Sequence, residues 1–373
     1  MNYLPTSLSS DIARRSDAIA IARVICILGV VYVHAWTGLG GVALAEMRGT
    51  AQDNLRWLLM EVFGRSAVPL LGLISGWLVA GSRTTRDWRG HIRRKAQTIL
   101  LPMILWNIIA IMAVSGAALI AGLQAPTPQS VGWVAQEVLI LSRNPDINVQ
   151  MPFLRDLFLC MVAAPLLIRL PTGGLALIVA VAGLCHIMGW GPPALMRASI
   201  LLFFTTGIIA RRHGGAEKVA AMPLLPALLP FLMLMGAQLY RAIVIGDAGL
   251  RSSQAALDLA VRVSAALAFW RIAWGLAQSS IRAVLLRIEP YAFFLFCSHL
   301  ILIWVGGPLI GKLSGRMGEP LYPLYLLAQP LLILAVVVVI ANGLRRVSPA
   351  AAGVLSGGRL AARRQAASRT VMA

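Results

Sequence analysis

Charge is scarce in this chain: of its 373 residues, 13% are Asp, Glu, Lys or Arg, whereas soluble domains average about 25%. Cysteine is also rare. The four cysteines have no CxxC spacing and all fall in apolar segments, which excludes a disulfide framework and a metal site built on cysteine. No G-x-x-x-x-G-K-S/T loop for nucleotide phosphates is present. Because 58% of the residues are hydrophobic, the composition indicates a membrane protein with several spans.

Windows of about 20 apolar residues, the length needed to cross a bilayer, predict an all-α polytopic protein with about ten transmembrane helices. They lie at roughly 18–38, 55–80, 97–120, 150–169, 173–189, 195–210, 221–245, 254–275, 289–311 and 321–342. The connections are short, so we expect one integral-membrane domain over residues 1–345. Residues 346–373 mix Ala, Gly, Ser and Arg without apolar periodicity, which predicts a basic, disordered cytoplasmic tail.

The basic residues are distributed unevenly between the two sides of this predicted topology. With the N-terminus in the cytoplasm, the cytoplasmic segments hold 20 of the 33 Lys and Arg residues and the outer segments hold 7. The positive-inside rule requires such an asymmetry, so we expect both termini to be cytoplasmic. Attraction of the basic loops and tail to anionic membrane lipid then accounts for the formal net charge of +19, and no nucleic-acid partner is needed.

The first hydrophobic segment contains two ionisable residues, Arg23 and His34. Ionisable side chains within a membrane usually face the protein interior and mark a pathway or a site. The two residues are eleven positions apart, about three helical turns, so both side chains are expected on one helix face about 16 Å apart. In this topology Arg23 lies in the cytoplasmic half of the membrane and His34 in the outer half. A buried neutral imidazole there can accept a proton from a hydroxyl group.

Arginines dominate the polar residues that follow. Arg65 stands four positions after Glu61 in the second segment, so it either pairs with Glu61 along one helix face or lines a substrate cavity. The next loop crowds six basic residues between Arg83 and Lys95. Since arginine can fork onto phosphate oxygens, this loop either binds an anionic cofactor with several phosphates or only controls topology. His91, in the same loop, needs no special role.

The fourth and ninth segments contain the remaining candidates. Arg155 and Asp156 are adjacent, so on a helix their side chains point about 100° apart, and each is expected to have a partner on another helix. They either latch two helices together or hydrogen bond to a polar substrate that enters from outside. His299 lies on an otherwise apolar segment and is either a packed, hydrogen-bonded residue or part of a site.

Five motifs, in this order and spacing, resemble the membrane acyltransferase-3 family over almost the whole chain. They are ARVICILGVVYVH with Arg23 and His34, RSAVPLLGLISGWL, the Arg-x-x-Arg of Arg83 and Arg86, FLRDLF and YAFFLFCSHL. The resemblance implies transfer of acetyl or related acyl groups to extracytoplasmic glycans, with acyl-CoA as the donor. Many relatives carry an additional SGNH-type domain, and this chain is expected to lack one, like acyltransferases that decorate bacterial exopolysaccharides.

The resemblance also implies roles for the candidate residues. His34 becomes catalytic, either as the base that activates the acceptor hydroxyl or as a transient acyl carrier. Arg23, about three turns toward the cytoplasm, then either binds the phosphate or carbonyl of the donor or only fixes the helix. Arg83 and Arg86 become candidates for binding the CoA phosphates. The substrate-binding candidates are Arg65, Arg155, Asp156 and His299.

The hypothesis from the sequence is therefore a multi-pass O-acyltransferase of the bacterial inner membrane. It would move an acyl group, in the first place acetyl, from cytoplasmic acyl-CoA to a hydroxyl of an exopolysaccharide, another cell-surface glycan or a lipid-linked precursor. Acyl-CoA is expected as a substrate, with no permanently bound cofactor and no metal, and glycan-assembly proteins as partners. The alternative is a secondary transporter of an anionic or sugar substrate, which the absence of a visible internal repeat disfavours.

Overall fold

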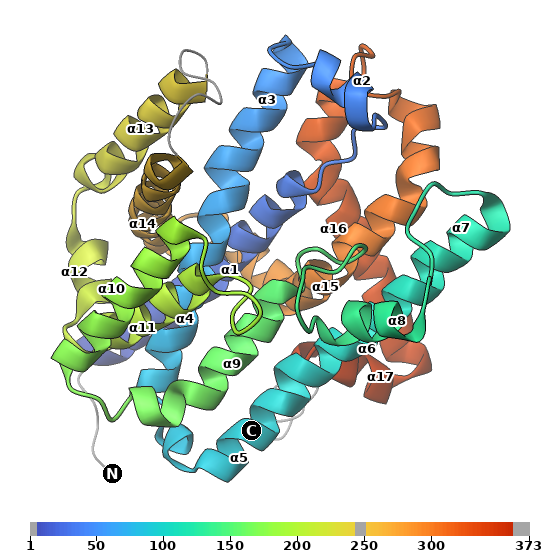
Figure 1. The fold of residues 1–373 in the computed structure, drawn as a ribbon. Helices are drawn as coiled ribbons and strands as arrows, with labels where there is room; N and C mark the ends of the chain where they lie inside the picture. Colours follow the sequence, from blue (N-terminus) through green and yellow to red (C-terminus); the bar gives the residue numbers. More distant parts are fainter. Residues whose placement is uncertain (1–5, 243–250, 361–373) are drawn as a thin grey trace.

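The computed structural model describes residues 6–242 and 251–360, except the side chains of residues 6–10 and 65–67. Within that part of the chain every regular element is a helix (Figure 1). The predicted all-α class is confirmed.

Six stretches of the described chain are long and apolar enough to cross a membrane. They are α1 (Thr6–Val33); α3 (Ala51–Leu59), the π-helical turn η1 (Met60–Gly64) and α4 (Arg65–Ala80); α5 (Trp88–Lys95), η3 (Ala96–Leu100), α6 (Leu101–Ala110), η4 (Ile111–Ser115) and α7 (Gly116–Ala121); α14 (Arg251–Leu276); α15 (Arg282–Ser314); and α16 (Tyr322–Val347). A seventh span results if α12 (Gly215–Ala221) and α13 (Leu224–Tyr240), which are bent by 100°, count as one.

Three predicted spans correspond to shorter helices, α9 (Pro152–Leu167), α10 (Thr172–Met188) and α11 (Ala198–Arg212), with 16, 17 and 15 residues. At 1.5 Å per residue they are about 22–26 Å long, less than the roughly 30 Å of a bilayer's hydrocarbon core. The ten spans and the cytoplasmic position of both termini therefore stay predictions. The remaining elements are α2 (Gly41–Glu46), the 3₁₀ turn η2 (Arg83–Arg86), α8 (Val131–Leu139) and α17 (Pro349–Leu355).

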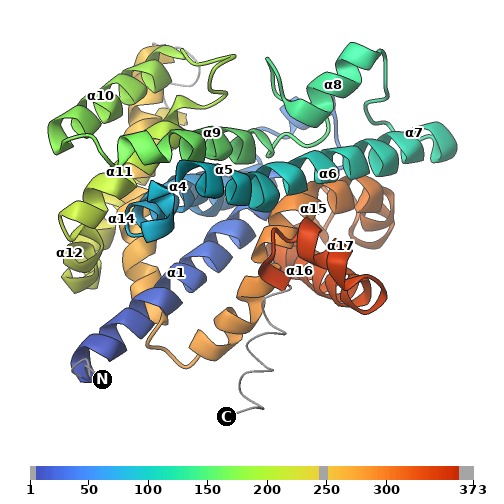
Figure 2. The same cartoon turned by 90° about the horizontal axis from the view of Figure 1, so that it is seen from below.

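α1 is the central helix of the bundle and packs against α4, α14, α15 and α16 (Figures 1 and 2). The apolar part of α1, from Ala18 onward, lies in the protein interior and buries Ala18, Ile21, Cys26 and Val31 almost completely. The helix ends at Val33, directly before His34. The predicted first span of 18–38 is therefore too long at its C-terminal end, because Trp36 turns away to pack on Tyr325.

Glycines let α4 and α11 approach until their backbones touch. A Cβ atom on Gly76 would overlap the carbonyl of Phe204, and one on Gly207 would overlap the carbonyl of Leu73. Small residues permit such close packing between membrane helices.

A Gly76→Ala substitution is therefore expected to lower the stability of the folded protein by about 1–3 kcal/mol, the usual cost of overpacking. Thermal unfolding of the detergent-purified protein measures this. Gly116→Ala is the matched control, since nothing lies within 4 Å of a Cβ added there. Equal melting temperatures for the two variants would contradict the close helix contact.

The segment after α16 is ordered up to residue 360. Ser348 caps α17 by accepting a hydrogen bond from the Ala351 N–H at 3.3 Å, and Pro349 occupies the first helical turn, both favourable at a helix start. The indole N–H of Trp106 donates to the Leu355 carbonyl at 3.0 Å and ties α17 to α6. The expected disorder is wrong for these residues, while 361–373 lie outside the described part.

Candidate active site

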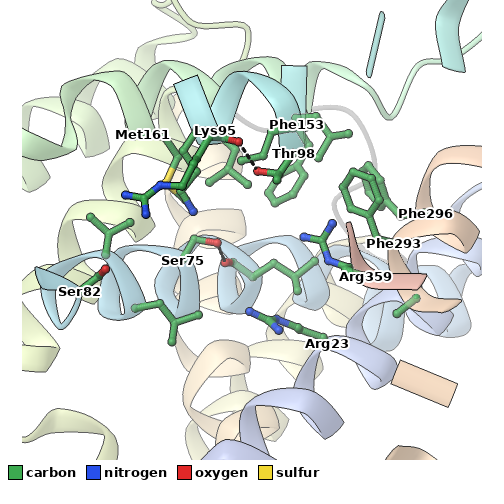
Figure 3. A pocket seen from close by; sticks show the side chains of 18 of the residues that line it. Arg23, Ser75, Ser82, Lys95, Thr98, Phe153, Met161, Phe293, Phe296 and Arg359 are labelled. Carbon is green, nitrogen blue, oxygen red and sulfur yellow. Dashed lines mark hydrogen bonds between the residues drawn. The ribbon is translucent and has the colours of Figure 1, made fainter. Parts of the chain in front are cut away.

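A cavity of about 540 Å³ lies where α1, α4, α5, η3, α9, α15 and the segment after α17 meet (Figure 3). Its volume falls in the range of small-molecule binding pockets. The walls combine apolar side chains with several hydroxyl groups, those of Ser75, Ser82, Thr84, Thr85 and Thr98.

Positive charge dominates this cavity. Arg23, Arg94, Lys95 and Arg359 line it, and Glu289 is the one acidic residue among its described lining residues. Glu289 already has a partner, because Nη1 of Arg23 lies 3.3 Å from its Oε1. Figure 3 shows Arg23 and Arg359 pointing into the same space from two different segments. An anion with more than one charge would be stabilised here.

Arg359 is cationic despite its position inside the protein. Burial, and secondarily the nearby charge of Arg23, lowers the pKa of Arg359 to about 10, which still leaves the guanidinium protonated at neutral pH. Its Cζ lies 4.0 Å from the ring centroid of Phe293, a cation–π contact. The cavity therefore keeps its excess positive charge under physiological conditions.

A second polar group, His34 with His299, lies further along the same helices. The two ring centroids are 5.4 Å apart and the ring planes differ by 40°. His299 is fully buried. Its Nδ1 lies 2.9 Å from the Phe296 carbonyl and 3.1 Å from the Leu295 carbonyl. Because carbonyl oxygens only accept, these contacts assign the proton to Nδ1 and leave Nε2 as a bare acceptor.

The cavity and the histidine pair lie at two levels, that is, at two positions along the axes of the paired helices α1 and α15. Arg23 meets Glu289 and His34 meets His299, so α1 and α15 run in the same direction. The two positions on α15 are ten residues apart, about 15 Å along a helix. Arg23 on α1 and His34, directly after the end of α1, both contact residues of α15, as expected from their spacing. Phe296 lines the cavity, and its ring centroid is 6.3 Å from that of His299, so one aromatic ring separates the two levels.

The other predicted phosphate ligands stand beside the cavity instead of in it. Arg83 and Arg86 are exposed and are not among the lining residues, whereas Thr84 and Thr85, between them on η2, are. The side chain of Arg65 lies outside the described residues. η2 therefore contributes hydroxyl groups to the wall and places its two arginines just outside it.

Arg155 and Asp156 form an ion pair with each other, with Nη1 of Arg155 2.8 Å from Oδ1 of Asp156. Although adjacent side chains leave a helix about 100° apart, the long arginine side chain bends back to the carboxylate. Both also hold the loop before α11: Oδ2 of Asp156 accepts from the Arg197 backbone N–H at 2.7 Å, and Arg155 donates to the carbonyls of Pro193 and Ala194. This geometry is that of a latch between α9 and α11.

Five ionisable residues of the cavity wall are not among the candidates from the sequence: His91, Arg94, Lys95, Glu289 and Arg359. Arg94 and Lys95 lie within a basic run, and Glu289 stands beside Pro290 at the start of an apolar stretch, where a carboxylate is a usable signal. Arg359 lies in the segment predicted to be disordered. The view that His91 needs no role is corrected, since it is buried, lines the cavity and has Nε2 3.1 Å from the Met161 carbonyl.

Comparison with known proteins fits this arrangement. No solved structure matches the chain significantly. The succinoglycan biosynthesis protein ExoH of Rhizobium meliloti (strain 1021) is 28% identical in an alignment that covers 95% of each protein. The sequence profile of an acyltransferase domain matches residues 16–342. The match covers most of the chain, including His34, His299 and every cavity-lining residue except Arg359. The chain therefore belongs to this acyltransferase family and is a multi-pass membrane acyltransferase.

Proposed function

We propose that the protein is an inner-membrane O-acyltransferase that carries an acyl group from cytoplasmic acyl-CoA to a hydroxyl of an exopolysaccharide or its lipid-linked precursor. The observation that carries the proposal is the pair of sites on α1 and α15, one rich in cations and one made of two histidines. The printed name of the relative, which places it in succinoglycan biosynthesis, supports a polysaccharide as the acceptor. Family membership favours this proposal over the transporter alternative.

The cation-lined cavity is the proposed donor site. Phosphate groups of CoA form charge-assisted hydrogen bonds with arginine and lysine, and Arg23 and Lys95 offer such donors. The pantetheine arm of acyl-CoA is long and flexible and ends in the thioester. With the phosphates held beside Arg23, this arm extends past Phe296 toward the histidines. Arg83 and Arg86 then contact the part of the donor that projects from the cavity.

The histidine pair is the proposed site of transfer. Nε2 of His299 is a buried acceptor for which the described residues supply no hydrogen. A small ring rotation lets an N–H of His34 donate to it, which leaves the other nitrogen of His34 as the base. His34 removes the proton of the acceptor hydroxyl while the new C–O bond forms. The C–S bond breaks, and the proton passes to the leaving thiolate to give CoA.

The donor site is tested by CoA binding to the purified protein. Lys95→Ala should weaken binding about 10- to 100-fold, because it removes a charge-assisted contact inside the cavity. The double variant Arg83→Ala with Arg86→Ala should weaken it less, because both side chains remain hydrated outside the cavity. Isothermal titration calorimetry with CoA measures both effects.

Arg169→Ala removes a positive charge that is exposed and is not among the cavity-lining residues, and it should bind CoA as the wild type does. Absence of CoA affinity in the wild type would overturn the proposed donor and favour the transporter. Loading membranes with labelled acetyl-CoA or succinyl-CoA and following the label into glycan identifies the acyl group.

A further inference from the structure

Arg359 lies seventeen residues beyond the end of the family match at residue 342, yet its side chain reaches the cavity. We propose that Arg359 binds the donor phosphates, so that the segment after α17 completes the donor site from outside the acyltransferase domain. The inference rests on the proposed function, because it assigns a ligand to the same cavity.

The segment that carries Arg359 is held firmly. Ser356 is fully buried, and its hydroxyl accepts from the Leu360 N–H at 3.1 Å and donates to the Gly353 carbonyl at 3.1 Å. Leu360 is 3% exposed and belongs to the main core. With the bond from Trp106 to Leu355, these contacts fix the backbone on both sides of Arg359.

Gly357 brings this segment against the helical turn η3. Its φ is +59°, in the left-handed region that favours glycine, and a Cβ atom there would lie 2.5 Å from the Thr98 carbonyl. Thr98 itself lines the cavity. A glycine thus permits the backbone approach that delivers Arg359 into the wall beside η3.

The surroundings of Arg359 are those of a residue that binds an anion. Its Nη1 donates to the Ser356 carbonyl at 3.1 Å, and its Cζ stacks over Phe293. Within the described part of the chain no carboxylate forms an ion pair with it, since Glu289 pairs with Arg23. The charges near Arg359 are the positive Arg23 and Lys95 and the negative Glu289, which already pairs with Arg23. A half-buried cation with an excess of like charges around it is costly, and a bound phosphate removes that cost.

The test compares Arg359→Gln, Arg359→Lys and the control Arg346→Gln in the full-length purified protein. Arg346 is exposed at the end of α16, also beyond the family match. Arg359→Gln should raise the Kd for CoA about 10- to 100-fold, Arg359→Lys should raise it less, and Arg346→Gln should leave it unchanged. Pantetheine, which has no phosphate, should bind the wild type and Arg359→Gln equally.

Melting temperatures of the ligand-free proteins separate binding from a structural role. Arg359→Gln should melt near the wild-type temperature, because relief of the repulsion from Arg23 and Lys95 offsets the lost contacts with Ser356 and Phe293. Unchanged CoA affinity in Arg359→Gln, while the wild type binds CoA, would overturn this inference alone. So would an equal loss of affinity for CoA and pantetheine. Failure of the wild type and Arg346→Gln to bind CoA would instead overturn the proposed function.

Discussion

A His34→Ala variant should transfer acyl groups about 10²- to 10⁴-fold more slowly than the wild type, the usual contribution of a general base, and should keep its affinity for CoA. The reason is the division of the site into two levels: His34 faces His299, and neither is among the residues that line the cation-rich cavity. Membranes that contain each protein are loaded with labelled acyl-CoA, and the label in glycan is counted over time.

His213→Ala is the matched control, because it removes an exposed imidazole outside both sites. It should transfer at the wild-type rate. Undiminished transfer by His34→Ala would exclude His34 as the base. Label that stays covalently attached to wild-type protein after rapid quenching, and is lost in His34→Ala, would indicate that His34 carries the acyl group itself.

Arg23 and His34 could be predicted as site residues from the sequence, because ionisable residues are rare in an apolar membrane segment. An arginine or a histidine in an apolar helix is expensive wherever the helix packs, so Arg23 and His34 stand out without knowledge of any partner. Their partners could not be found in this way. Glu289 lies 266 positions after Arg23, and only the packing of α1 on α15 brings the two together.

The basic loop shows what residue type alone cannot decide. Thr84, Thr85, Arg94 and Lys95 line the cavity, whereas Arg83 and Arg86 stand beside it. Which side of a short turn faces inward depends on the neighbouring helices. For the same reason the composition of residues 346–373 predicted disorder, while anchoring by Trp106 orders α17 and brings Arg359 to the cavity.

The number of transmembrane spans could not be predicted from the sequence for a different physical reason. Hydropathy finds apolar segments, but α9, α10 and α11 are apolar and shorter than a bilayer is thick. A short apolar helix either crosses a locally thinned membrane or stays within the protein. The parallel run of α1 and α15 requires an odd number of crossings between them, which holds for the six long spans and for the ten predicted ones.

An Asp156→Ala variant is expected to lose about 3–5 kcal/mol of stability, as found when one partner of a buried ion pair is removed. Asp156 is fully buried, and its two carboxylate oxygens accept from the Arg155 guanidinium and the Arg197 backbone N–H. The substitution leaves the Arg197 N–H without its acceptor and Arg155 without its carboxylate partner, so the latch between α9 and the loop before α11 keeps only the bonds from Arg155 to Pro193 and Ala194. Unfolding of the purified protein by SDS titration measures the loss.

Glu217→Ala provides the comparison, because Glu217 forms an ion pair with Arg15 of similar length, 2.7 Å, but with 47% of its side chain exposed. Breaking an exposed pair should cost less than about 1 kcal/mol. If Asp156→Ala is as stable as Glu217→Ala and only its KM for the acceptor rises, then Asp156 binds the acceptor glycan and the latch is secondary. Because Asp156 is buried and accepts two hydrogen bonds whereas Glu217 is exposed, a large difference in stability assigns Asp156 to the scaffold that joins α9 to the loop before α11.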